Sequence, residues 1–363
     1  DRRVILVQDP TLVHPPAMSV FNDGPSAFST THAHQEFLGL KGALAELGVQ
    51  PCDVLHLTSR LALDELRAMA AAAVRHPPSR SAEVLQNLTA MPAGELLQVI
   101  VERPSLTLTP NPRLSQISPD SDSESYTLQP LYGLMFPRDH LLQVEDLCFV
   151  ANFRRDERQA EAELVALSIR AAQPQLDLVR LDSFFEGGDA LACRRRRVLF
   201  LAHGYRSDRR AALRIAAAVA GRGWSTVLLP DRRRARDEFH LDHWAAVVGE
   251  TLVCDEQRVA DLAEVEHVTP EAGDQPDAKR LDQVLEFLGM SLLPVQRQVA
   301  GPFGFNVLDL PQAAAVICSR SAPEMAAPLQ ELGRNVVSVE FSTFESNFGS
   351  IHCATNDLYE IDE

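Results

Sequence analysis

Cys353 is the residue of this chain best placed to act as a nucleophile. It stands in the segment Gly349-Ser350-Ile351-His352-Cys353, behind two small residues and next to a histidine. An isolated cysteine is more often a small buried residue than a reactive group. A reactive thiol needs positive charge nearby to favour the thiolate, and a bound guanidinium would supply that charge. Cys353 is therefore a candidate nucleophile only if other polar groups of the chain lie close to its thiol.

Three segments upstream carry acidic side chains that could complete such a site. They are Phe136-Pro137-Arg138-Asp139, Phe185-Glu186-Gly187-Gly188-Asp189 and His240-Leu241-Asp242. On a strand, His240 and Asp242 would face the same side because the side-chain period is two. The glycines beside Glu186 allow a sharp turn and a close approach to a ligand. A thiol, a histidine that transfers protons and carboxylates that bind a cation predict an enzyme acting on a guanidinium group.

Each segment also has an ordinary structural explanation. His240 and Asp242 could be a surface pair, the Gly-Gly segment an acidic turn, and Asp139 the ion-pair partner of Arg138. His240, His243 and Cys254 could be drawn as a metal set, but they lack an established metal-ligand spacing.

Composition narrows the class of protein. The 363 residues carry a formal charge of −16, which argues against nucleic acid or an acidic membrane as partner and agrees with a small cationic substrate. The six cysteines form no CxxC pair, as expected of reduced thiols in a cytoplasmic protein. No stretch reaches the roughly 18 apolar residues of a membrane span, and the first residues lack the apolar region of a signal peptide.

Hydrophobic periodicity predicts a chain that mixes strands and helices. Helices are expected from 31 to 47 and in three segments between 60 and 102, whereas the Pro- and Ser-rich residues 103–128 are expected to form a long mobile loop, a candidate lid. From 144 onward, strands alternate with single helices, and 245–254 is expected to be a strand pair bent at Gly249-Glu250. The acidic segments recur about once per unit of this alternation, which indicates structural repetition.

Taken in order, these segments resemble the guanidino-group-modifying, or pentein, superfamily, and within it the arginine deiminases. The similarity runs through nearly the whole chain. It rests on Ser19–Asp23 with His34–Phe37, on Leu128–Leu131 with Met135–Asp139 (similar to PLPNLxFTRDP), on residues 186–189, on 240–242, on Asn306–Leu308 and on the Cys353 segment. The resemblance implies a single catalytic domain over residues 1–363, a five-bladed α/β propeller with a helical insertion at about 60–105.

The same resemblance assigns roles to individual residues. Cys353 is implied as the nucleophile, His240 as general acid and base, Glu186 as its orienting partner, and Asp139 and Asp242 as the carboxylates that grip the guanidinium. Phe136, Asp189 and Arg206 are implied at the amino-acid end of the substrate. The implied reaction converts L-arginine to L-citrulline and ammonia through a covalent amidino-cysteine and requires no metal or organic cofactor. A homo-oligomer is a further expectation.

Departures from the deiminase pattern leave the substrate open. Phe348 stands where deiminases carry an arginine that binds the substrate α-carboxylate, and Arg158 or Arg155 is the candidate replacement. The segment Ser350–Thr355 is as similar to amidinotransferases and agmatine deiminases. The alternatives are an amidinotransferase, a deiminase of agmatine or of a modified arginine, and a binding protein without turnover; the complete set of five catalytic candidates argues against the last.

Overall fold

The computed structural model describes residues 3–13, 29–110, 122–271 and 276–359. The resemblance segment Ser19–Asp23 lies outside these residues. None of the helices in the described part is long and apolar enough to cross a membrane.

Five sheets in the described part share one pattern of pairing. In each, a first and a second strand pair antiparallel, and the second also pairs parallel with a third strand that follows a helical segment. A parallel partner needs such a crossover because a tight turn can only join antiparallel neighbours. The first two strands are successive in the sequence in four of the sheets, and in the fifth they come from opposite ends of the chain. The expected structural repetition is therefore present in the strand pairing.

The strands of these sheets, in the order first, second and third, are as follows. The first sheet contains β5 (Leu141–Val144), β6 (Leu147–Val150) and β7 (Asp177–Arg180). The second contains β8 (Ala190–Cys193), β9 (Val198–His203) and β10 (Ser225–Pro230), extended by β13 (Val265–Val268) and β14 (Asp277–Lys279). The third contains β11 (Ala245–Val248), β12 (Thr251–Asp255) and β15 (Ser291–Val295). The fourth contains β16 (Leu308–Leu310), β17 (Ala315–Ser319) and β18 (Asn335–Val339). The fifth contains β19 (Asn356–Tyr359), β1 (Arg3–Val7) and β2 (Gln50–Asp53).

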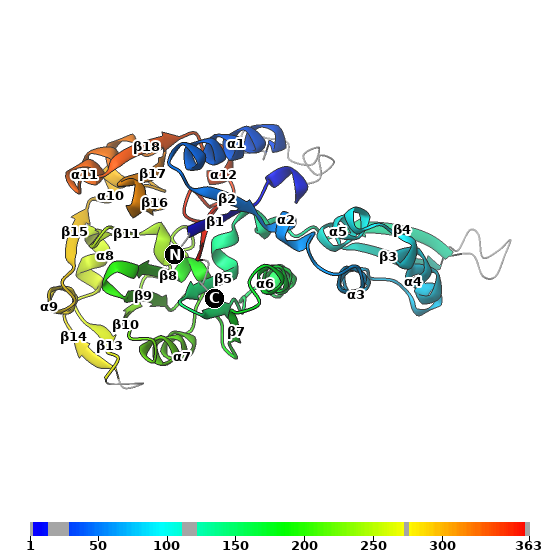
Figure 1. Ribbon diagram of the computed structural model, residues 1–363, viewed down its shortest axis with the longest axis horizontal. Coiled ribbons are helices and arrows are strands. Elements are labelled where there is room, and N and C mark those ends of the chain that lie inside the picture. The colour runs from blue at the N-terminus through cyan, green and yellow to red at the C-terminus, as the bar shows by residue number, and fades with distance from the viewer. Residues whose placement is uncertain (1–2, 14–28, 111–121, 272–275, 360–363) are drawn as a thin grey trace.

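The helices lie mostly at the periphery of the main body. In Figure 1, α1, α6, α7 and α11 surround strands β1, β5, β8 and β11, which lie nearer the centre. Apolar side chains of strands and helices bury one another in several clusters, of which the largest joins α1 and α6 to β1. The helices of the main body are α1 (Thr30–Glu46), α2 (Val54–Thr58), α6 (Gln159–Ala172), α7 (Arg209–Ala220), α8 (Glu256–Asp261), α9 (Leu281–Phe287), α10 (Arg297–Ala300), α11 (Ala326–Glu331) and α12 (Ser342–Glu345).

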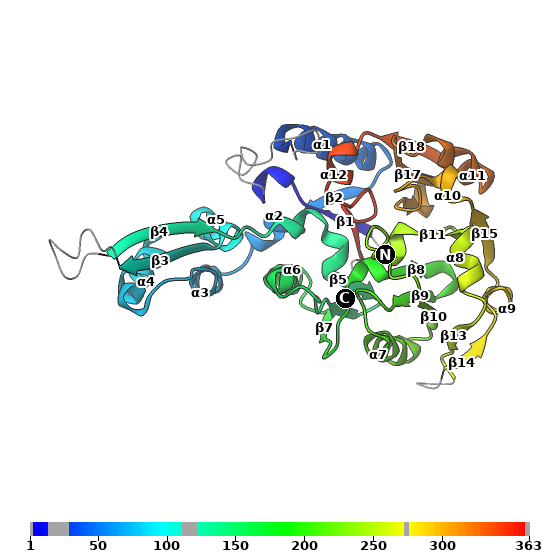
Figure 2. The ribbon, with the colours of Figure 1, turned by 180° about the vertical axis from the view of Figure 1, so that it is seen from behind.

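A separate lobe projects from one side of the main body in Figures 1 and 2. It contains α3 (Leu63–Ala73), α4 (Ser81–Ala90) and α5 (Ala93–Glu102), which form where the sequence predicts helices, and the hairpin of β3 (Pro104–Pro110) and β4 (Asp122–Leu128).

The hairpin corrects the prediction of a loop over 103–128. Strands β3 and β4 pair antiparallel along their whole length, with Leu106 opposite Tyr126. The alternation of polar and apolar residues in Pro104–Pro110 carries this strand signal, and the Pro- and Ser-rich composition obscured it. Residues 111–121, at the tip, lie outside the described part of the chain.

Two strand predictions within the main body have different outcomes. The strand pair over 245–254 is confirmed, because β11 and β12 pair antiparallel across the Gly249 turn. The sequence also predicts a strand over 144–152, and the structure forms the shorter β6 there; the hairpin with β5, whose turn contains Glu145 at a φ of 52°, was not expected.

The segment before the first strand of each sheet carries the polar residues that the sequence singled out. Asp139 precedes β5, Glu186 precedes β8, His240 and Asp242 precede β11, Asn306 precedes β16, and Cys353 precedes β19.

Contacts join these segments to one another. The Arg138 N–H donates to the Cys353 carbonyl oxygen at 3.2 Å, and the Leu241 N–H donates to Asp189 Oδ1 at 3.0 Å. The Asn306 side chain bonds both the Asp242 carbonyl oxygen and the backbone of Cys353. Residues far apart in the sequence meet because each sheet presents the same position to a common site.

Candidate active site

The Cys353 thiol is buried and held by side chains from two other sheets. Asn306 Nδ2 donates to Cys353 Sγ at 3.1 Å, and Asn306 Oδ1 accepts the Cys353 N–H at 3.1 Å. Sγ also lies 3.4 Å from Asp242 Oδ2, which is 2.9 Å from His352 Nδ1. The thiol therefore has a fixed orientation and a carboxylate within reach.

His240 is held between two carboxylates. Its Nε2 lies 2.9 Å from Glu186 Oε2, and its Nδ1 lies 3.5 Å from Asp139 Oδ1. All three residues are buried. A Cβ at Gly188 would lie 2.6 Å from His240 Nδ1, and one at Gly187 would overlap the backbone of the Arg138 segment. The two glycines are therefore needed where the Arg138 and His240 segments pack, and their close approach to a ligand stays a prediction.

Three buried polar atoms at the centre of the site have no hydrogen-bond partner among the described residues. They are Asp139 Oδ1, Asp242 Oδ1 and His240 Nδ1. Buried polar groups are almost always paired, and an unpaired one costs about 1–3 kcal/mol. The two carboxylate oxygens accept hydrogen bonds, so a ligand with several N–H donors that reached them would satisfy both.

A second buried network fixes Asp139 from behind. Arg158 Nη1 donates to Asp139 Oδ2 at 2.8 Å, and Arg158 Nε donates to Glu161 Oε2 at 2.9 Å. Glu161 also accepts the Gly133 N–H at 2.8 Å and lies 3.1 Å from His140 Nε2. Burial disfavours the charge of Arg158, but Glu161 and Asp139 outweigh it and raise the pKa of Arg158. One Asp139 oxygen is therefore occupied, and the other is free for a ligand.

Charge coupling sets the protonation of His240 and Glu186. Burial lowers the pKa of His240, but the Asp139 charge and the hydrogen bond to Glu186 outweigh it and raise that pKa to about 9. Burial raises the pKa of Glu186, but the bond to His240 dominates and lowers it to about 2. At pH 7 the pair is therefore an imidazolium and a carboxylate.

The thiol and the carboxylate beside it are shifted in opposite directions. Burial raises the pKa of Cys353 well above its usual value, and the charges of Asp242 and Asp139 raise it further. Burial also acts to raise the pKa of Asp242, but the bond from His352 and the nearby histidines lower it overall. Without a ligand the site holds a neutral thiol beside charged carboxylates, so a bound cation would favour the thiolate.

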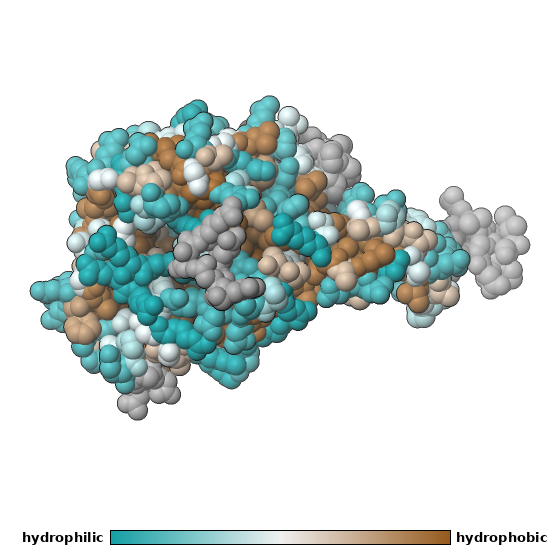
Figure 3. Space-filling model, in the orientation of Figure 1, coloured by the Kyte–Doolittle hydropathy of each residue, from teal (hydrophilic) through white to brown (hydrophobic). Residues whose placement is uncertain are grey.

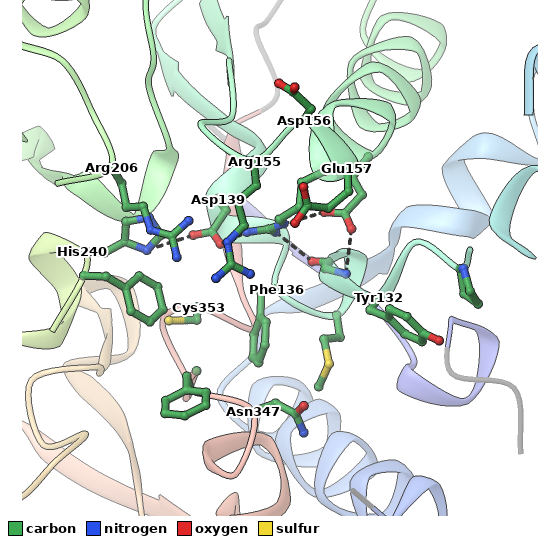
Figure 4. Close-up of a pocket in the computed structure, with 18 of the residues that line it drawn as sticks. Tyr132, Phe136, Asp139, Arg155, Asp156, Glu157, Arg206, His240, Asn347 and Cys353 are labelled. Carbon is green, nitrogen blue, oxygen red and sulfur yellow. Dashed lines mark hydrogen bonds and ion pairs between the residues drawn. The ribbon is translucent and has the colours of Figure 1, made fainter. Parts of the chain in front are cut away.

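Asp139, His240 and Cys353 line one cavity of about 1460 Å³ that lies between the main body and the base of the lobe. Asp242, expected to grip the guanidinium, is buried and does not line the cavity. Figure 4 shows Cys353, His240, Asp139, Arg206 and Arg155 around it, with Arg155 pointing into the space above Phe136. In the view of Figure 3, hydrophilic side chains dominate the main body and apolar patches extend onto the lobe.

The loop before Cys353 forms an aromatic wall of the cavity. The Phe136 ring packs so closely on Gly349 that a Cβ there would overlap it. The loop begins at α12, whose first N–H groups, on Thr343 and Phe344, donate to the buried carboxylate of Glu36. Phe348 lines the cavity and is exposed, at a φ of 65°.

Not every residue expected at the substrate lies there. Asp189 is buried, does not line the cavity, and accepts the Leu241 N–H, so it supports the His240 segment instead of contacting the amino-acid end. Burial raises the pKa of Asp189 to about 7. Arg158 lines the cavity, but Asp139 and Glu161 occupy its guanidinium.

Phe136, Arg206 and Arg155 do line the cavity. Arg206 lies 3.6 Å from Glu186 Oε1 and 4.8 Å from the centre of the Phe239 ring. Arg155 is exposed, and its side chain has no ion pair or hydrogen bond within the described ranges. Arg155 and Arg158 are the two candidates to replace the arginine that deiminases carry where this chain has Phe348. Of these two, Arg155 is therefore the one with a free guanidinium.

Two groups of side chains have donor atoms close enough to hold a metal ion. His240 groups with Asp242 and His243, and also with Asp139 and Glu186, with all donor atoms in each group within 4.8 Å. His240 belongs to both groups, and its Nε2 is engaged by Glu186. Neither group is assigned a metal.

Asn306 is the contact residue whose role the motif analysis missed. It orients Cys353 through both its side-chain amide atoms. Its segment was recognised, but a single Asn carries no chemical signal. The available signal was positional, because Asn306 stands before the first strand of the fourth sheet as the other site residues stand before theirs.

Comparison with known proteins assigns the family. The model of the arginine deiminase family matches residues 63–359, and curated protein sequences give no significant match.

Solved structures share the fold. The N-terminal domain of ArgZ, an arginine dihydrolase from the ornithine–ammonia cycle in cyanobacteria bound to product, is 16% identical, with a TM-score of 0.60 and coverage of 99% of this chain and 98% of that one. A mutant of DDAH from Pseudomonas aeruginosa complexed with citrulline is 12% identical, with a TM-score of 0.58 and 98% coverage of both chains. A dimethylarginine dimethylaminohydrolase adduct with S-methyl-L-thiocitrulline is 12% identical, with a TM-score of 0.59 and coverage of 99% and 100%. With the family match spanning most of the chain, the protein belongs to the arginine deiminase family within the pentein superfamily and is an amidine-hydrolysing enzyme.

Proposed function

We propose that this enzyme hydrolyses the guanidinium group of an arginine-type substrate through a covalent amidino-Cys353 intermediate, with L-arginine converted to L-citrulline and ammonia as the first candidate reaction. The observation that carries the proposal is the two buried carboxylate oxygens, Asp139 Oδ1 and Asp242 Oδ1, that lack a hydrogen-bond partner among the described residues, together with the thiol. A planar guanidinium presents N–H donors in a rigid fork that suits carboxylate oxygens.

Binding of the cation prepares the nucleophile. A guanidinium between Asp139 and Asp242 offsets the two negative charges that raise the pKa of Cys353. The thiol proton is then released to solvent, while Asp242, whose pKa is lowered, keeps its charge. The thiolate then forms a C–S bond with the guanidinium carbon, giving a tetrahedral adduct.

His240 serves both halves of the reaction. It is protonated at pH 7, so its Nδ1 proton can be given to the departing nitrogen as the C–N bond breaks and ammonia leaves. The neutral imidazole then takes a proton from water, whose oxygen attacks the amidino carbon. The C–S bond breaks as the hydroxyl proton of the adduct passes to the thiolate, and the ureido product forms. The proton that the thiol first released to solvent converts the ammonia to ammonium.

Arg155 is the proposed partner of the substrate α-carboxylate. Its exposed guanidinium points into the cavity in Figure 4, while Arg158 and Arg206 are paired with acids. Phe136 and Arg206 shape the same wall.

The five similar sheets also support the proposal of an α/β propeller with the lobe as an insertion. The six free cysteines support a cytoplasmic location, and a homo-oligomer remains an expectation.

The test is the product formed by the purified protein from L-arginine, agmatine, methylated arginines and larger guanidines, with Cys353→Ala as control. Ammonia with one equivalent of ureido product, absent in the variant, supports the proposal. Turnover that requires an added amine would replace the proposed hydrolysis with amidino transfer. Ornithine as the end product would place the enzyme with the dihydrolases. Binding of a guanidine without any turnover would make the chain a binding protein.

A further inference from the structure

The cavity is larger than a free amino acid needs. Ligand pockets for drug-sized molecules are roughly 300–1,000 Å³, and this cavity measures about 1460 Å³. The wall beyond Phe136 is formed by Tyr132 and Gly133 and by the base of the lobe, which contributes Arg75, Arg103 and Leu128.

Arg75 and Arg103 are neighbours across two backbone segments. Arg75 forms a parallel bridge with Ser105, donating its N–H to the Pro104 carbonyl at 3.0 Å and accepting the Leu106 N–H at 2.8 Å. Arg103 immediately precedes β3 and ends α5. Burial and the charge of Arg75 both lower the pKa of Arg103. Two like charges are therefore held close together at the cavity wall.

These two guanidinium groups lack an acidic partner in the part of the chain that the structure describes. No ion pair or side-chain hydrogen bond joins Arg75 or Arg103 to a carboxylate there. Glu161 is the acid whose charge acts on Arg103, but Arg158, His140 and the Gly133 N–H already bond it. The other acidic residues of the cavity wall are Asp139, Asp156, Glu157 and Asp237.

We propose that Arg75 and Arg103 bind a second carboxylate of the substrate, so that the preferred substrate is an arginine whose α-amino group carries an acidic acyl extension. This inference rests on the proposed hydrolysis of a guanidinium group at Cys353. L-arginine fills the guanidinium and α-carboxylate positions, whereas the extended compound also uses the wall contributed by the lobe. Paired arginines suit this role because each can bind a carboxylate with two parallel hydrogen bonds.

The test compares Nα-glutaryl-L-arginine with Nα-pentanoyl-L-arginine, which differ by a carboxylate in place of a methyl group. We expect kcat/KM to be about 10- to 100-fold higher for the glutaryl compound, as charge-assisted hydrogen bonds predict. The advantage should shrink as ionic strength rises. It should disappear in the double variant Arg75→Gln/Arg103→Gln, while turnover of the pentanoyl compound stays within about two-fold.

Arg170→Gln is the matched control, because it removes an exposed arginine of α6 that does not line the cavity. Calorimetric titration of Cys353→Ala with both compounds measures the same preference without turnover. Equal kcat/KM and equal affinity for the two compounds, or an equal loss for both in the double variant, would overturn the inference and leave the proposed hydrolysis intact. Absence of turnover with every guanidine, including L-arginine, would instead defeat the proposed function and the substrate preference with it.

Discussion

Arg158 donates to Asp139 Oδ2 at 2.8 Å, which leaves Asp139 Oδ1 directed to His240 Nδ1 at 3.5 Å. This ion pair divides the carboxylate into one oxygen bound by the protein and one available to a ligand. It also identifies Arg158 as a positioning residue that acts through Asp139, in place of the substrate contact expected from the sequence.

Arg158→Gln should lower kcat/KM by about 100-fold, mainly through kcat, because Asp139 is then free to rotate away from the guanidinium. Arg158→Lys should recover part of the loss, since an ammonium can hold Asp139 but not Glu161 as well. Steady-state kinetics of both variants with L-arginine and agmatine provides the measurement. If Arg158 bound the substrate α-carboxylate, the loss would fall on KM and would be absent with agmatine.

Loss of the Asn306 side chain should make the thiol less reactive. Asn306→Ala removes the 3.1 Å hydrogen bond to Sγ, which favours the thiolate. We expect the pKa of Cys353 to rise further and kcat to fall by about 10- to 100-fold. The rate of alkylation by iodoacetamide as a function of pH reports this pKa directly. Asn335→Ala, at an exposed position of β18, is a suitable control.

The high-pH limb of activity should depend on Glu186. His240 must be protonated to release ammonia, so kcat/KM should fall as the pH rises through about 9. Glu186→Gln removes a charged partner that raises the pKa of His240, and the limb should move to lower pH. An unchanged limb in the variant would show that another group titrates there. NMR titration of the His240 ring assigns the shift independently of rate.

The carboxyl group of Asp189 should make the free energy of unfolding decrease as the pH rises. Burial raises its pKa in the folded state to about 7, well above the unfolded value, so the folded state binds the extra proton between the two values. The free energy of unfolding therefore loses about 1.4 kcal/mol per pH unit from this group as the pH rises toward 7. Asp189→Asn keeps an oxygen for the Leu241 N–H and removes the charge. Urea denaturation of both proteins at pH 5, 6 and 7 should show the variant gaining in relative stability as the pH rises; a constant difference would contradict the assignment.

The sequence carried most of the information on local structure. Apolar periodicity located α1, α3, α4 and α5 within a few residues, because these helices bury one face along their length. It missed the β3–β4 hairpin, where composition outweighed alternation, and short strands such as β2 and β19, whose pairing partners lie at the other end of the chain. Strands that depend on long-range pairing carry little local signal.

The sequence by itself determined the chemical inventory: a thiol, a histidine and carboxylates in an order that resembles guanidine-modifying enzymes. Only the tertiary structure decided what each member does. Side-chain type does not encode which oxygen of Asp139 is occupied, that Asp189 faces a backbone N–H, or that Arg155 is free while Arg158 is paired. Those outcomes depend on which segments the sheets bring together, because hydrogen bonds and charge coupling act over a few ångströms whatever the separation in sequence.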